Sequence, residues 1–312
     1  MAVLSGWSAG LAGARAGTSS ARSDEPVNGS KYAGKCLMSM LALSLFGCAT
    51  TPGTGTAPAH DNLDAVTWLQ TSAEYAAVAA GVYAAAVTAL EGVATTDVPA
   101  DRGRAVVLDV DETVLDNAAY QAQLVLDDET YSRDSWDAWI ALEAAAAVPG
   151  AVDFIRAAQA RDFHVAFITN RSCRPRPGAS DGCPQRDETL ANLQAIGIAT
   201  EEVTLMLRGD RPSERCRSLL SDAERVDGTW SSDKASRRAC VSLDHDIVML
   251  FGDQLGDFTA VSDGVGAETG RQVAAGYSEA WGTRWFMLPN PTYGEWKPPG
   301  TVEKRARIRG ID

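Results

Sequence analysis

Five short apolar runs, separated by helical stretches, constrain the fold of this chain more than any other feature. The runs are continuously hydrophobic rather than alternating, and they cover residues 105–108, 163–168, 203–206, 247–251 and 285–288. Helical stretches precede or separate them, among them residues 62–93, 151–160, 186–195 and 232–240. A strand without a polar face needs cover on both sides, which a parallel sheet flanked by helices provides. The sequence therefore predicts an α/β fold with ligands at the carboxyl ends of its strands.

Two carboxylates leave the first predicted strand two residues apart. Asp109 and Asp111 stand in the segment Asp-Val-Asp-Glu-Thr, so both can point into one crevice. Paired carboxylates suit a hard cation with oxygen ligands. They also suit a nucleophile that works beside a general acid or base. Taken alone, the segment fits equally well a strand followed by a helix-capping aspartate.

The second and third polar clusters suit phosphate. Thr169 and Asn170 follow the second predicted strand, where a hydroxyl and backbone N–H groups can hold phosphate oxygens. Lys234 is the only lysine between Lys35 and Lys297, and it stands at a predicted helix start. A compact positive charge there suits a transferring phosphoryl group. Without the other clusters, Lys234 would equally fit an exposed surface lysine.

The fourth cluster follows the fourth predicted strand, in Gly252-Asp-Gln-Leu-Gly-Asp257. Asp253 and Asp257 converge if a helix begins between them, and they can then complete a Mg²⁺ site with Asp109. A single Gly-Asp followed by another Asp is a common turn-and-cap pattern. The four clusters together are far more specific, because they occur in order and each lies at a strand end or a helix start.

This ordered set of Asp, Thr, Lys and paired Asp resembles the haloacid-dehalogenase (HAD) superfamily of phosphotransferases. Two longer stretches resemble one branch, the class C acid phosphatases, which are bacterial outer-membrane lipoprotein 5′-nucleotidases. They are residues 106–117, followed by Tyr120, and residues 248–258. The resemblance covers roughly residues 62–300. It implies a HAD-like Rossmannoid parallel sheet with helices on both faces and a small helical cap region, in a domain over residues 62–312 with helical N-terminal and cap segments.

The resemblance also implies a role for each motif residue. Asp109 would attack phosphorus and form an aspartyl-phosphate, and Asp111 would protonate the leaving alcohol and then activate water. The other implied roles are phosphate binding by Thr169, Asn170 and Lys234, and Mg²⁺ binding by Asp109, the Asp111 carbonyl, Asp253 and Asp257. An in-line transfer needs charge neutralised on the equatorial oxygens, and a cation with a lysine supplies it.

The resemblance also bears on the substrate and the partners of the protein. The resemblance implies a homodimer and a nucleoside monophosphate or aromatic phosphate as substrate, with Tyr120 and Tyr293 as candidate aromatic faces. The alternatives are a HAD phosphatase for sugar phosphates and a non-catalytic surface lipoprotein. The net charge of −13 argues against binding of nucleic-acid polymers, which needs a basic surface. A small anionic substrate is compatible with this charge, because a bound cation reverses the local field.

The N-terminal region reads as an export signal. Lys31 and Lys35 precede an apolar run too short to span a bilayer, and the run ends at Cys48. Residues 45–48 resemble the lipoprotein box, although Phe46 departs from it. We therefore expect a signal region (1–48), a flexible tether (49–61) and lipidation of Cys48 in an exported outer-membrane or periplasmic protein. The alternatives are a plain signal peptide cleaved nearby and a buried helix.

Four cysteines follow Cys48. In an oxidising compartment an even number suggests disulfides, for which three pairings exist. Sequence neighbours favour Cys173–Cys183 and Cys216–Cys240. Zinc binding is the weaker alternative, because there is no Cys-x-x-Cys spacing and no histidine lies near them.

Overall fold

The computed structural model describes residues 60–93, 102–178, 180–260, 267–298 and 300–311. All of them belong to one compact unit, Thr56–Asp312. The predicted signal region with Cys48, and nearly all of the predicted tether, lie outside the described residues. The proposed boundaries at residues 48 and 61 therefore stay predictions.

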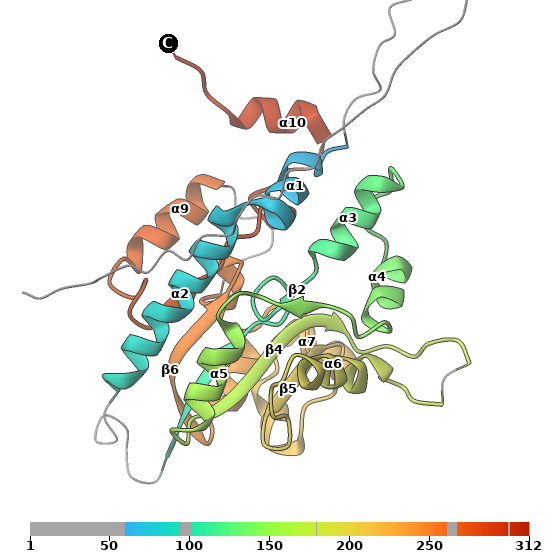
Figure 1. Cartoon of the computed structure of the whole chain (residues 1–312). Coiled ribbons are helices and arrows are strands. Elements are labelled where there is room, and N and C mark those ends of the chain that lie inside the picture. Colours follow the sequence, from blue (N-terminus) through green and yellow to red (C-terminus); the bar gives the residue numbers. More distant parts are fainter. Residues whose placement is uncertain (1–59, 94–101, 179, 261–266, 299, 312) are drawn as a thin grey trace, which may run out of the picture. The chain divides into compact units, whose positions relative to one another are not determined.

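A five-stranded parallel sheet lies at the centre of this unit (Figure 1). Its strands are β1 (Gly103–Leu108), β4 (His164–Ser172), β5 (Thr204–Arg208), β6 (His245–Gly252) and β7 (Trp285–Met287). They pair in the order β5-β4-β1-β6-β7, and every pairing is parallel. Each predicted apolar run is one of these strands. Because β4 and β6 flank β1, the polar clusters that follow these three strands are brought to one edge.

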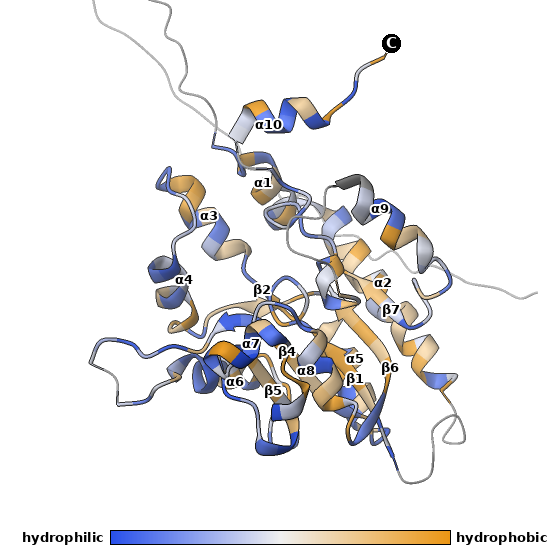
Figure 2. Cartoon of the chain, turned by 180° about the vertical axis from the view of Figure 1, so that it is seen from behind, coloured by the Kyte–Doolittle hydropathy of each residue, from blue (hydrophilic) through white to orange (hydrophobic). Residues whose placement is uncertain are grey.

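Both faces of the sheet are covered, as its apolar strands require. The covering helices are α2 (Ala73–Glu91), α5 (Ala151–Gln159), α6 (Pro184–Ala195) and α8 (Ala235–Val241). Successive side chains of β1 point to opposite faces. Val106 and Leu108 join the large core with α2, α5 and α6, whereas Ala105 and Val107 join a second core that Val241 of α8 completes. The strands are mostly hydrophobic in Figure 2. The predicted α/β class is confirmed.

The stretch predicted as one helix over residues 62–93 is two helices, α1 (Leu63–Thr71) and α2. Ser72 separates them, because its backbone is extended and its side chain accepts a hydrogen bond from the Tyr75 N–H. Within the described part of the chain, α2 is the one helix long and apolar enough to cross a membrane. Its Tyr83 ring is buried in the large core, stacked 5.6 Å from Phe251, so α2 is a core helix.

Two short helices form the small cap expected from the resemblance. They are α3 (Ala118–Leu126) and α4 (Arg133–Ile140), inserted between β2 (Leu115–Asp116) and β3 (Ala146–Ala147), a short antiparallel pair. The Tyr120 ring of α3 packs against Trp136 and Trp139 of α4, at centroid distances of 5.0 and 6.2 Å. Figure 1 shows α3 and α4 side by side at one end of the sheet.

Both predicted disulfides are present. Cys173–Cys183 closes the loop between β4 and α6, and Cys216–Cys240 joins η2 (Glu214–Leu219) to α8. All four cysteines after Cys48 are therefore paired, which excludes the zinc alternative. The remaining elements are α7 (Asp222–Asp227), η3 (Leu255–Asp257), α9 (Ala267–Gly276) and α10 (Gly300–Arg307).

Candidate active site

The predicted clusters meet at the carboxyl edge of the sheet. Asp109 follows β1 directly, and its backbone N–H donates to the carbonyl of Phe251 in β6 at 3.0 Å. Lys234, at the N-terminus of α8, places its Nζ 2.5 Å from Asp109 Oδ1 and 2.5 Å from Asp257 Oδ1. Lys234 is only 5% exposed. One buried ammonium therefore lies between two buried carboxylates.

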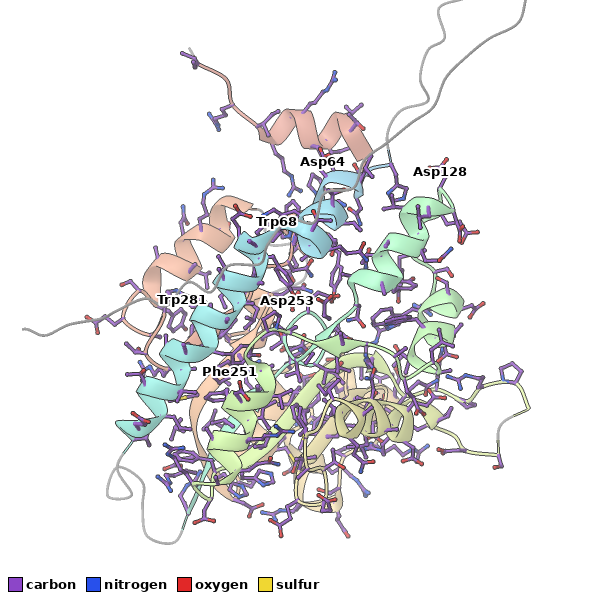
Figure 3. All side chains as sticks on the ribbon, viewed as in Figure 1. Asp64, Trp68, Asp128, Phe251, Asp253 and Trp281 are labelled. Carbon is purple, nitrogen blue, oxygen red and sulfur yellow. A yellow bond between two sulfur atoms is a disulfide. The ribbon has the colours of Figure 1, made fainter. Side chains whose placement is uncertain are left out.

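A cluster of three carboxylates occupies the same edge. Asp109, Asp253 and Asp257 each offer an oxygen, and these oxygens lie within 4.8 Å of one another. As expected, a helical turn (η3) begins between Asp253 and Asp257. Gly252 lets the Asp257 side chain lie against the end of β6, because a Cβ at position 252 would lie 2.3 Å from the Asp257 Cβ. Asn290, after β7, donates its Nδ2 to Asp253 at 2.7 Å. Figure 3 shows Asp253 just beyond the core residue Phe251.

Asp111 lies in a separate hydrogen-bond network. Arg171 donates from Nη2 at 2.9 Å and from Nε at 3.1 Å to Asp111 Oδ1, and Asn117 donates its Nδ2 to the same oxygen at 3.0 Å. Trp139 of the cap donates in turn to Asn117 at 2.8 Å. Neither Arg171 nor Asn117 has a role predicted from the sequence. Arg171 could have been found, because residues two apart on a strand, such as Thr169 and Arg171, face the same side.

The side chains of the two predicted phosphate-binding residues of β4, Thr169 and Asn170, are hydrogen-bonded to other groups of the protein. The buried Thr169 hydroxyl accepts from the Arg171 N–H at 3.0 Å and donates to Asp111 Oδ2 at 3.4 Å. Asn170 is exposed and lines the pocket, and its Nδ2 donates to the Ser232 carbonyl at 3.1 Å. The buried Arg237, which no sequence motif singles out, donates to the Thr169 carbonyl and to Asn170 Oδ1. Arg237 thus joins the end of β4 to the loop before α8.

Buried negative charge dominates the electrostatics. Burial raises the pKa of Asp109 to about 7, with Asp257 and Asp111 reinforcing this and Lys234 opposing it. Burial also raises the pKa of Asp253 well above its usual range, and the charges of Asp257 and Asp109 add to that effect. Burial alone would lower the pKa of Lys234, but Asp109 and Asp257 outweigh it and leave the pKa raised. The cluster therefore favours the binding of positive charge.

A pocket of about 960 Å³ opens above this cluster. Asp109, Asp111, Asp257, Arg171 and Lys234 form its floor. Tyr120, Tyr131 and Trp136 form an aromatic wall, in which the Trp136 ring lies against both tyrosines. Tyr293 lines the pocket from the loop after β7. Both candidate aromatics of the sequence analysis therefore lie in the pocket, and Tyr131 and Trp136 join them. Asp128, at the tip of α3 in Figure 3, belongs to the rim.

Comparison with known proteins agrees with this geometry. The family model for the HAD superfamily, subfamily IIIB (acid phosphatase), matches residues 42–296. The solved class C acid phosphatase from Bacillus anthracis is 27% identical, with a TM-score of 0.64, over 81% of this chain and 99% of that one. The same Bacillus enzyme with tungstate bound gives 27% identity and a TM-score of 0.64 over 82% and 99%. Because the family match spans most of its length, this chain belongs to the subfamily IIIB acid phosphatases of the HAD superfamily and is a phosphomonoester hydrolase.

Proposed function

We propose that this phosphatase depends on Mg²⁺ and works through an aspartyl-phosphate formed on Asp109. One observation carries the proposal: Asp109 is buried at the end of β1, 2.5 Å from the Lys234 ammonium and within 4.8 Å of the other two carboxylates of its cluster. A nucleophile, a cation site and a fixed positive charge thus share one position, as phosphoryl transfer requires.

The donor set fits Mg²⁺. Asp109, Asp253 and Asp257 offer only oxygen, the ligand that this hard cation prefers. The Asp111 carbonyl is a further ligand implied by the resemblance. When bound, the metal neutralises charge on the phosphoryl oxygens and makes phosphorus more electrophilic.

The protein side chains then divide the chemistry between them. An Asp109 oxygen forms a bond to phosphorus while the bond from phosphorus to the ester oxygen breaks, and Asp111 gives its proton to that leaving oxygen. Asp111 next takes a proton from water, and the resulting hydroxide attacks the aspartyl-phosphate. Inorganic phosphate leaves and the Asp109 carboxylate is restored. The hydrogen bonds from Arg171 and Asn117 orient Asp111 for both steps.

Phosphate binding would fall chiefly to Lys234, whose ammonium lies on the pocket floor. Thr169 and Asn170 would contribute at the end of β4. Because the Asn170 side chain is bonded to Ser232 and Arg237, we assign it to shaping the backbone of this strand end. The N–H groups of that backbone are donors for phosphate oxygens.

A nucleoside monophosphate or an aryl phosphate is the proposed substrate. The pocket, at about 960 Å³, is far larger than a phosphate group needs, and one wall is aromatic. Rings of this kind stack on a base or a phenyl group. A sugar phosphate is the second candidate, since the floor would serve it equally well.

We further propose that the protein is exported and attached to the outer membrane through a lipidated Cys48, or otherwise released into the periplasm. The two disulfides support export, because such bonds persist in oxidising compartments. Mass spectrometry of the mature N-terminus tests the lipid, and an unmodified start beyond Cys48 would exclude it. The proposed homodimer is tested by analytical ultracentrifugation, where a single monomeric species would contradict it.

The experiment for the proposed function is an assay of purified protein against phosphomonoesters with and without EDTA. Nucleoside monophosphates, p-nitrophenyl phosphate, glycerol phosphate and a sugar phosphate form the panel. We expect activity to disappear in EDTA, to return with Mg²⁺ and to be highest on aromatic substrates. An Asp109→Asn preparation serves as the control for contaminating phosphatases. Full activity in EDTA would refute the metal requirement.

A further inference from the structure

Glu112, next to Asp111, is a buried acid with no hydrogen-bond partner. It is 3% exposed, and neither Oε1 nor Oε2 accepts a hydrogen bond. Buried carboxylates are nearly always paired, because removing a charge from water is costly. No ion pair to Glu112 occurs in the described part of the chain. The position therefore needs an explanation beyond packing.

The backbone at Glu112 is also in a conformation that a glutamate rarely adopts, with φ at +54°. Side chains with a Cβ are disfavoured in this left-handed region. A tight loop fixes the residue there: the Glu112 N–H donates to the Leu115 carbonyl, and the Val114 N–H donates to the Val110 carbonyl, each at 2.8 Å. Strain of this kind persists where the surrounding structure holds a residue for a function.

The charges around Glu112 show what it is suited to bind. Asp111, Asp253 and Asp116 all act on it, and all three are negative. The neighbouring amide of Asn117 favours the charged form of Glu112, but it donates its hydrogen bond to Asp111 Oδ1. Asp253 belongs to the carboxylate cluster proposed to hold Mg²⁺. Glu112 itself is not among the residues of that cluster, whose oxygens lie within 4.8 Å of one another. It therefore lies beside the cation site without being one of its direct ligands.

We infer that Glu112 binds the divalent cation indirectly, by accepting hydrogen bonds from the water molecules that the cation keeps. Mg²⁺ gives up its water reluctantly and usually retains several water ligands. Each retained water is a strong donor that needs an acceptor, and neither buried oxygen of Glu112 has a partner at hydrogen-bond geometry in the described part of the chain. Residues that hydrogen-bond to the ligands of a metal also contribute to the affinity for that metal. The inference rests on the metal site of the proposed function.

The test is a calorimetric titration of metal-free, full-length protein with Mg²⁺, for the wild type and for Glu112→Gln. We expect the variant to bind Mg²⁺ about 10–100-fold more weakly, the usual loss for an outer partner of a metal site. Its melting temperature without metal should stay close to that of the wild type, because the amide keeps the size and shape of the side chain. Glu143→Gln is the matched control: Glu143 is exposed and has a similar φ of +52°. Its Mg²⁺ affinity should be unchanged.

The outcomes separate the inference from the proposed function. A wild type that binds Mg²⁺ while Glu112→Gln binds it equally well refutes the role of Glu112 and leaves the metal site standing. A wild type that binds no Mg²⁺ refutes both. A lower melting temperature with unchanged Mg²⁺ affinity would mark Glu112 as structural. Should Glu112→Gln not fold, Glu112→Asp withdraws the carboxylate by one methylene and is expected to lose part of the affinity, whereas full affinity refutes the inference.

Discussion

The floor and the aromatic wall of the pocket are built in different ways. On the floor, Asp109 and Lys234 are 8% and 5% exposed, and they follow a central strand and begin a helix that packs on the sheet. On the wall, Tyr131 is 60% exposed, and Trp136 belongs to a helix outside the sheet. The sheet thus fixes the groups assigned to chemistry. The cap insertion supplies three of the aromatic groups assigned to substrate choice, and the loop after β7 supplies the fourth, Tyr293. Such an insertion can vary without disturbing the chemistry.

Side-chain hydrogen bonds nevertheless attach the cap helix α4 to the rest of the protein. Asp137 of α4 accepts hydrogen bonds from Arg176 at 2.9 Å and from Gln185 at 2.7 Å. Arg176 also pairs with Glu188 of α6, and it stands in the loop that the Cys173–Cys183 disulfide closes. These contacts join the cap to the body of the protein from one side. Floor variants should therefore change kcat, and wall variants should change KM.

The largest effect is expected at the floor, from Asp109→Asn. An amide is no nucleophile towards phosphorus, and no weaker route to the phosphoenzyme remains, so kcat should fall by several orders of magnitude. Steady-state kinetics on p-nitrophenyl phosphate measures this. Asp128→Asn is the control, because Asp128 is an exposed aspartate on the rim of the same pocket. Near-normal turnover by Asp109→Asn would refute the assignment of the chemistry to the floor residues.

A smaller loss is expected from Asp111→Asn, roughly 10²–10⁴-fold in kcat for a missing general acid. The loss should depend on the leaving group, since p-nitrophenolate leaves without a proton more readily than an alkoxide does. We therefore expect Asp111→Asn to lower kcat/KM, which reports the steps up to formation of the phosphoenzyme, more for glycerol phosphate than for p-nitrophenyl phosphate. Equal losses in kcat/KM on both substrates would show that Asp111 does not protonate the leaving oxygen.

In the loop after β7, which lines the same pocket, Tyr293→Ala should raise KM for nucleoside monophosphates and p-nitrophenyl phosphate. Stacking of a ring on a base contributes about 1–3 kcal/mol, and tenfold in affinity corresponds to about 1.4 kcal/mol. The KM for glycerol phosphate and the Mg²⁺ requirement should barely change. If aromatic and aliphatic substrates lose equally, Tyr293 is structural, and the preference for nucleotides loses its support from this residue.

The smallest effect concerns the stability of the metal-free protein. Burial raises the pKa of Asp109 from 3.8 to about 7, so between these values the native state holds a proton that the unfolded chain has released. The free energy of unfolding should therefore fall as pH rises from about 4 to about 7. Asp109→Asn should weaken this decline and raise the melting temperature near pH 7 by a few degrees. Thermal unfolding in EDTA across this range measures both, and a wild-type profile that rises with pH would contradict the charge distribution given for the floor.

Much of the floor follows from the sequence because strand ends in a parallel sheet converge by geometry. Asp109, Thr169 and Asp253 could be placed because each follows a predicted strand. Lys234 could be placed because it stands at a predicted helix start within the same ordered set. The break at Ser72 between α1 and α2 cannot be predicted from periodicity, because the apolar pattern of residues 62–93 continues across Ser72. The hydrogen bond from the Tyr75 N–H to the Ser72 side chain is what shows the break in the structure.

The groups that support the floor were harder to predict. Arg237 looks like a surface residue in the sequence, and its burial depends on carbonyl groups distant in the chain, such as that of Thr169. Glu112 could not be recognised as buried and unpaired without coordinates, since a glutamate after an aspartate most often faces solvent. Long-range packing decides such positions, and local pattern carries little information about it.

The central claim, that Asp109 carries the phosphoryl group, is tested most directly by trapping the phosphoenzyme. Protein turning over p-nitrophenyl phosphate with Mg²⁺ is quenched in acid, digested and analysed by mass spectrometry. We predict one phosphoryl group on the peptide that contains Asp109, removed by hydroxylamine as an acyl phosphate should be, and absent from Asp109→Asn. A phosphoryl group on any other residue, or its persistence in Asp109→Asn, would contradict the account.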